Sequence, residues 1–116
     1  MIYGLNPAFL ALKAFGKKLE ITSNNISNVD TGGFKKSRAL LQETFPAGVT
    51  VSINRINTPG APIFGQSGVQ RAGERSNVDI GEETVQLVTT RAAYTANLKT
   101  LKTGDEILGT LLDVVD

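Results

Sequence analysis

The sequence predicts a mainly α-helical protein with a small β element, in which the long N- and C-terminal helices pack as an antiparallel coiled-coil-like pair. Apolar residues recur at a spacing of seven over the last forty-one residues, and again over the first thirty. The middle of the chain carries short alternating runs broken by Pro and Gly. These runs predict a short β-hairpin or irregular segment between the helices.

The C-terminal helix is expected to begin at about Asp79. Asp79 with Glu82 three residues later fits a capping box, so we interpret Glu82 and Glu83 as helix-start charge rather than as a catalytic carboxylate pair. Offsets of four residues from the main stripe add Leu98 and Leu112 to the expected contact surface. Steps of seven from Ile80 reach Leu87, Tyr94, Leu101, Leu108 and Val115.

The N-terminal helix is expected to begin at Asn6-Pro7, with Asn as the cap and Pro as the first helical residue. It should end near Asp30, because residues 31–33 (TGG) break a helix. Lysines occupy the opposite face, so the helix is amphipathic. The expected apolar positions are Leu5, Ala8, Leu12, Phe15, Leu19, Ile26 and Val29.

The segment between the helices has weaker signals. Residues 34–43 fit a short helical turn or an arm, whereas residues 49–54 alternate as a half-buried strand does. A turn at residues 58–62 should lead to a return strand through Ile63, Phe64 and Val69, giving a loose hairpin or disorder between residues 45 and 75. We therefore divide one structural unit into residues 1–34, 35–75 and 76–116.

Composition limits the function of the chain. Its 116 residues contain no Cys and no His, which removes the commonest metal ligands and general bases, so we expect no enzyme activity and no cofactor or metal. A formal net charge of +1 argues against nucleic acid as a partner. The basic cluster Lys35, Lys36 and Arg38 is interpreted as a solvated loop. We also expect no cleavable signal peptide and no stable membrane insertion.

The helix pair leaves apolar side chains outside its contact surface, notably Val85 and Val88. We therefore expect the molecule to complete its core with copies of itself or of close relatives. The alternative is a small monomeric helical core. A third possibility is a membrane-surface helix that uses Lys13, Lys17 and Lys18 beside its apolar face.

Two motifs at opposite ends of the chain resemble the bacterial flagellar axial proteins of the basal-body rod and hook. Residues 23–36 (SNNISNVDTGGFKK) are similar to that family's N-terminal signature. Residues 76–79 (SNVD), 93–97 (AYTAN) and 102–112 (KTGDEILGTLL) are similar to its C-terminal region. The motif residues that we single out are Asn24, Asn25, Asn28, Gly33, Phe34, Asn77 and Asn97. With only a short segment between the motifs, the chain resembles a proximal-rod-like member or a short divergent paralogue.

The resemblance implies a structural subunit of the flagellar basal body that assembles through its terminal helices into the periplasm-spanning rod. Its implied partners are itself, other rod or hook subunits and the flagellar type III export apparatus. The alternative is a monomeric, rod-like adaptor that binds the export or basal-body machinery. The amides of Asn24, Asn25 and Asn28 then either satisfy backbone groups and neighbouring subunits or simply end the helix.

Overall fold

The computed structural model describes residues 2–64 and 70–115. Its elements are two long helices and two antiparallel β-hairpins, each of two strands. In chain order they are α1 (Ile2–Ser27), β1 (Ser37–Glu43), β2 (Val49–Arg55), β3 (Pro62–Phe64), β4 (Gln70–Glu74) and α2 (Ile80–Val115).

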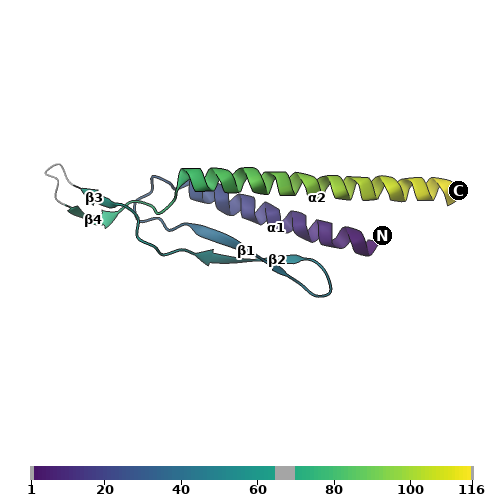
Figure 1. Cartoon of the computed structure of the whole chain (residues 1–116), viewed down its shortest axis with the longest axis horizontal. Coiled ribbons are helices and arrows are strands. Elements are labelled where there is room, and N and C mark those ends of the chain that lie inside the picture. Colours follow the sequence, from purple (N-terminus) through teal and green to yellow (C-terminus); the bar gives the residue numbers. More distant parts are fainter. Residues whose placement is uncertain (1, 65–69, 116) are drawn as a thin grey trace.

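The two helices lie side by side and run in opposite directions (Figure 1). Gly104 of α2 faces the side chain of Leu5 near the beginning of α1, and Gly16 faces the ring of Tyr94. Both pairs fit one antiparallel register, in which the number of an α1 residue and the number of the α2 residue beside it add up to about 110. The predicted fold class, an antiparallel helix pair with a small β element, is confirmed.

Helix α1 is the central layer of the molecule. It contacts α2 on one side and both strands of the β1–β2 hairpin on another, as Figure 1 shows. The buried apolar residues of the described chain are Ala8, Ala14 and Ile21, all on α1. Two of the three are alanines, so the neighbouring elements approach the α1 backbone closely.

The predicted start of α1 at Asn6-Pro7 is wrong, because the helix already includes both residues and Pro7 lies inside it. Proline removes one main-chain hydrogen bond and disfavours a helical residue before it, but near a helix N-terminus the loss is small. The expected end was close, since regular helix stops at Ser27 and turns continue to Asp30.

The face of α2 that packs against α1 consists of two rows of residues, and only one of the two rows was predicted correctly. The main stripe is partly buried at Leu87, Tyr94, Leu101 and Leu108, as expected, but its two ends, Ile80 and Val115, are exposed. The second row of the contact surface consists of Glu83, Thr90, Asn97 and Gly104, of which Asn97 is partly buried and the other three are buried. Leu98 (50% exposed) and Leu112 (68% exposed) therefore lie outside the contact with α1, and placing them there was wrong. Small and polar side chains let the two helices approach closely, and a search for apolar residues does not detect them.

Residues 37–43 form a strand, which corrects the expected helical turn or arm at residues 34–43. This strand, β1, pairs with β2 in the register Ser37↔Arg55 to Glu43↔Val49. The expected strand at residues 49–54 is thus confirmed, but its partner precedes it in the chain rather than following the turn at residues 58–62. Three large apolar side chains of this hairpin, Leu40, Leu41 and Ile53, are exposed. Buried and exposed positions therefore do not alternate clearly along its strands.

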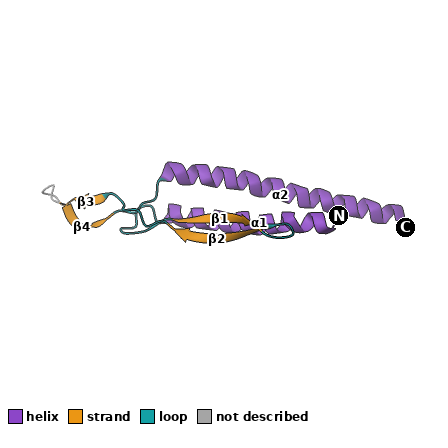
Figure 2. Ribbon diagram, turned by 60° about the horizontal axis from the view of Figure 1, so that its bottom comes forward, coloured by secondary structure: helices purple, strands orange, loops and turns teal. Residues whose placement is uncertain are grey.

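The second hairpin, β3–β4, projects beyond the helices at the end opposite to the chain termini (Figure 2). Ile63 and Phe64 lie in a strand, as expected, but this strand pairs with β4 and not with residues 49–54, which corrects the expected hairpin. The expected return residue Val69 lies outside the described residues. At the root of the hairpin, Gly60 lies against the main chain of Arg75. A β-carbon built on Gly60 would stand 1.8 Å from the carbonyl oxygen of Arg75.

Substituting Gly60→Ala is expected to destabilise the protein by about 1–3 kcal/mol, the usual cost of overpacking a site that cannot yield easily. The clash is with backbone atoms, so the two segments must separate. Urea unfolding followed by circular dichroism measures the loss. The control is Gly109→Ala, which meets nothing within 4 Å and should be stabilising by up to about 1 kcal/mol through helix propensity. Equal stabilities for the two variants would contradict the close approach of Gly60 to the main chain of Arg75.

The molecule is long and thin, with extents of 80 × 24 × 14 Å. Its radius of gyration is 20.5 Å, whereas a compact domain of this length has about 13 Å. A shape this narrow buries little apolar surface. Fifteen large apolar side chains in the described chain are exposed by more than a third, which indicates that the molecule offers surface to a partner.

Candidate assembly interface

The end of α1, the beginning of β1 and the beginning of α2 meet at one buried polar junction. Asn25 of α1 is fully buried there. Its amide nitrogen donates to the carbonyl oxygen of Ser37 (2.9 Å) and to Oε2 of Glu83 (3.2 Å), while its amide oxygen accepts from the Ser37 N–H (3.0 Å). One side chain therefore ties three elements together.

The junction also contains a buried ion pair. Glu83, in the first turn of α2, has no exposed surface, and Nη1 of Arg38 lies 2.5 Å from its Oε1. Nη2 of Arg38 donates to Glu82, and Nζ of Lys36 lies 3.5 Å from the other oxygen of Glu82. A buried carboxylate is stable only where a cation and hydrogen bonds compensate for lost hydration. Arg38 and Asn25 supply both.

These contacts correct two expectations about charge. Lys35, Lys36 and Arg38 are not a solvated loop, because their side chains are 14%, 13% and 18% exposed and each pairs with a carboxylate. Glu83 is not merely helix-start charge, because it is buried and paired. Half of the expected capping box is present, since Oδ1 of Asp79 accepts from the N–H of Gly81 at 2.8 Å and of Glu82 at 3.3 Å. The side chain of Glu82, expected to complete the box, pairs with Arg38 and Lys36 instead.

The ion pairs shift two ionisation equilibria. The hydrogen bond from Arg38, followed by the positive charges of Arg38 and Lys36, lowers the pKa of Glu82 below its ordinary value, although burial acts the other way. Burial by itself would lower the pKa of Arg38, but its hydrogen bonds to Glu82 and Glu83 and their negative charges raise it.

Acidification is expected to weaken the junction through Glu82. Because the pKa of Glu82 is lower in the folded protein, its contribution is fully present above the unfolded-state pKa and is lost as pH falls through the folded-state value. The melting temperature should therefore fall from about pH 5 downwards. In Glu82→Gln this part of the pH dependence should disappear. A variant with an unchanged acid profile would contradict the assignment.

Asn77 holds the linkers on either side of the β1–β2 hairpin. Its oxygen accepts from the Lys36 N–H at 2.7 Å, and its nitrogen donates to the carbonyl oxygens of Ile56 (2.8 Å) and Thr58 (3.1 Å). Gly33, at a φ of 73°, donates its N–H to the carbonyl oxygen of Glu74. Phe34, partly buried, accepts from the N–H of Asn77. This part of the motif joins the beginning of the first hairpin to the chain before α2.

The remaining motif asparagines act locally. Nδ2 of Asn28 donates to the carbonyl oxygen of Asn24 at 2.9 Å, which satisfies the end of α1. Asn97 donates in the same way to Ala93 within α2. Of the two readings of the Asn-rich segment, helix termination thus describes Asn28, whereas Asn25 binds neighbouring elements of its own chain.

The predicted contact residues fall into two groups. Most are partly buried along the inner surfaces of the helices and the turn after α1, while Leu98 and Leu112 are exposed. The partly buried ones are Leu5, Leu12, Phe15, Leu19, Ile26, Val29, Leu87, Tyr94, Leu101 and Leu108. As contacts between subunits, all of them stay predictions.

Apolar surface is left open in two places on α2. Val85 and Val88 are each 61% exposed on its outer side, as the sequence suggested. Beyond the beginning of α1, the last turns of α2 have no helix beside them (Figure 1). The exposed apolar side chains at this end of α2 are Ile107, Leu111, Leu112, Val114 and Val115.

Comparison with known proteins matches both ends of the chain to one group of proteins. Residues 5–35 match the family model "Flagella basal body rod protein", and residues 69–114 match "Flagellar basal body rod FlgEFG protein C-terminal". The chain belongs to the flagellar rod and hook protein family. This family is a structural component of the flagellum and not an enzyme family.

Individual rod and hook proteins resemble only part of the chain. Flagellar basal-body rod protein FlgG of Bacillus subtilis (strain 168) is 39% identical over 70 residues, which are 60% of this chain and 25% of that protein. The flagellar hook proteins FlgE of Salmonella typhimurium and Salmonella typhi are each 37% identical over 59 residues, 51% of this chain and 14% of theirs. The chain thus spans a quarter or less of the length of these rod and hook proteins.

Sequence reasoning missed several residues of this family member that build the junction and the helix contact. Glu83, Thr90 and Gly104 are buried at a spacing of seven or fourteen, which is a detectable signal once small and polar residues are counted. Arg38 had no local signal, since its partner Glu83 lies far away in the sequence. The hydroxyl of Thr90 has no hydrogen-bond partner among the described residues.

Residues 2–64 and 70–115 bring no three metal-ligating side chains together. No helix within those ranges has both the length and the hydropathy of a membrane span.

Proposed function

We propose that this chain is a structural subunit of the bacterial flagellar basal body that assembles with copies of itself through its terminal helices into the rod. The observation that carries the proposal is the exposed apolar surface of the helix pair, including Val85, Val88 and Leu112, in a chain of the rod and hook family. Burying that surface between copies would complete a core that one molecule cannot build.

The proposal includes a location and partners. As a rod subunit, the chain would lie in the periplasm-spanning rod after passing through the flagellar export apparatus. Copies of this chain would build one segment of the rod, and other rod or hook subunits would contact the two ends of that segment. The limited middle segment supports a proximal-rod-like position.

Sedimentation of the purified chain over a range of concentrations tests self-assembly. The proposal expects polymers that sediment rapidly above a threshold concentration and appear as filaments or tubes by electron microscopy. A species that stays monomeric up to millimolar concentration would contradict self-assembly and would favour the alternative, a monomeric adaptor for the export or basal-body machinery.

A further inference from the structure

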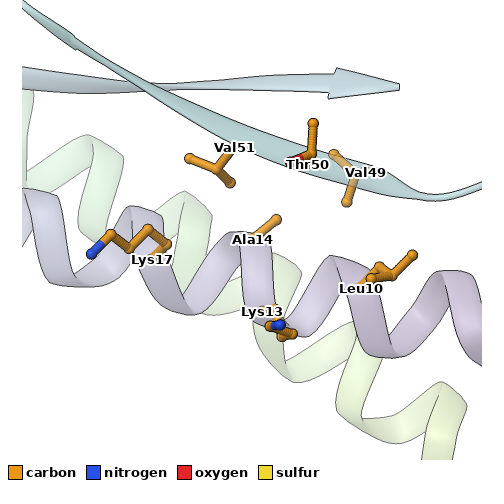
Figure 3. Close-up of a pocket in the computed structure, with 7 residues that line it drawn as sticks. All are labelled: Leu10, Lys13, Ala14, Lys17, Val49, Thr50 and Val51. Atoms are coloured by element: carbon orange, nitrogen blue, oxygen red, sulfur yellow. The ribbon is translucent and has the colours of Figure 1, made fainter. Parts of the chain in front are cut away.

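A groove lies between α1 and strand β2, on a side of α1 that α2 does not cover. Figure 3 shows Leu10 and Ala14 on the helix facing Val49 and Val51 on the strand. The groove has a volume of about 290 Å³, and Lys13 and Lys17 also line it. Lys17 pairs with Glu20 at 3.2 Å on the exposed surface of α1. The groove therefore combines an apolar floor with positive charge beside it.

The last turns of α2 have the complementary character. Apolar residues from Ile107 to Val115 share one broad face of the helix, and those listed above are exposed. Asp105 lies at the edge of this face, whereas Glu106 and Asp113 lie on the opposite side of the helix. This segment, residues 105–115, is called the α2 tail below.

We propose that the groove between α1 and β2 binds the α2 tail of a second copy of this chain. Apolar side chains of the tail would enter the groove, and Asp105, at the edge of the apolar face, would approach Lys13 and Lys17. The inference rests on the proposed self-assembly and specifies which surfaces meet. Because the donor and acceptor surfaces are different, the contact repeats from copy to copy and builds an open chain rather than a closed dimer.

The dimensions of the helices define the shift between copies. In the register of the helix pair, residues 10–17 of α1 lie level with about residues 92–99 of α2. The centre of the tail lies about fourteen to fifteen helical residues further along α2. For copies with the same orientation, the contact requires an axial shift of about 22 Å, from a rise of 1.5 Å per helical residue.

A charge exchange tests the contact. One variant carries Lys13→Glu and Lys17→Glu, and the other carries Asp105→Lys. Each alone places like charges together and should raise the concentration needed for assembly by about tenfold or more. An equal mixture restores opposite charges at every contact, so it should assemble like the parent chain. Assembly of each variant alone at the parental concentration, or no recovery in the mixture, would overturn the proposal.

Cysteine cross-linking locates the contact independently, because the parent chain contains no Cys. Polymers from an equal mixture of Thr50→Cys and Val114→Cys chains should form mixed disulfide dimers on mild oxidation. The matched control mixes Val88→Cys with Val114→Cys and should give few. If the chains polymerise like the parent, but the Val88→Cys and Val114→Cys mixture forms the disulfide and the Thr50→Cys and Val114→Cys mixture does not, the groove proposal is overturned and the rod function still stands. A parent chain that never polymerises would overturn both.

Discussion

The substitution Arg38→Ala is expected to lower the free energy of unfolding by about 3–5 kcal/mol, because it leaves the carboxylate of Glu83 buried without a cation. Glu83 is fully buried, and its described partners are Arg38 and the amide of Asn25. One amide hydrogen bond does not replace the lost hydration of a charge. Urea unfolding of the purified monomer, followed by circular dichroism at neutral pH, measures the difference.

The double variant Arg38→Ala with Glu83→Gln is the control for charge. Glutamine keeps the shape and removes the charge that Arg38 neutralises, so the double variant should recover a large part of the stability. If the double variant is as unstable as Arg38→Ala, the loss comes from packing of the arginine stem, and the buried ion pair is not what holds the junction.

Two aspartate substitutions on α2 are expected to separate folding from assembly. Leu101→Asp places a charge in the contact with α1. It should lower the free energy of unfolding by at least as much as truncating a buried leucine does, about 2–5 kcal/mol. Because the fold is lost, assembly should be lost too. Leu112→Asp changes a side chain that is 68% exposed. It should leave the monomer's stability nearly unchanged and still prevent assembly.

Thermal unfolding and sedimentation of both variants provide the comparison. Polymers of Leu112→Asp at the parental concentration would remove the α2 tail from the assembly surface. Normal incorporation of Leu101→Asp into polymers would contradict the proposed assembly through the terminal helices, since it would mean that the assembly does not need the helix pair of the monomer.

The helix pair was predictable because its signal is local and repeated. Steps of seven from Ile80 identify the correct inner stripe of α2 at Leu87, Tyr94 and Leu101. The second row was not predictable from hydropathy, since it consists of Glu83, Thr90, Asn97 and Gly104. What buries these residues is the close approach of α1, and their spacing of seven indicates it only when small and polar residues are counted with the apolar ones.

The junction and the first hairpin depended on distant partners. Strand β1 pairs with β2 and packs on α1, and these contacts override a local sequence with no clear alternation. Asn25 was recognisable as part of a motif, but its neighbours Asn24 and Asn28 have the same residue type and are exposed or act locally. Only the three-dimensional arrangement distinguishes the asparagine that ties α1 to β1 and α2.

The most direct test of a rod subunit is its presence in the rod. Intact basal bodies would be purified from the source cells, washed, and analysed by quantitative mass spectrometry. The account predicts that this chain is recovered in a fixed ratio to known rod subunits and persists through washing. Its absence from the particles, with the protein found unassembled elsewhere in the cell, would contradict the account and favour the adaptor.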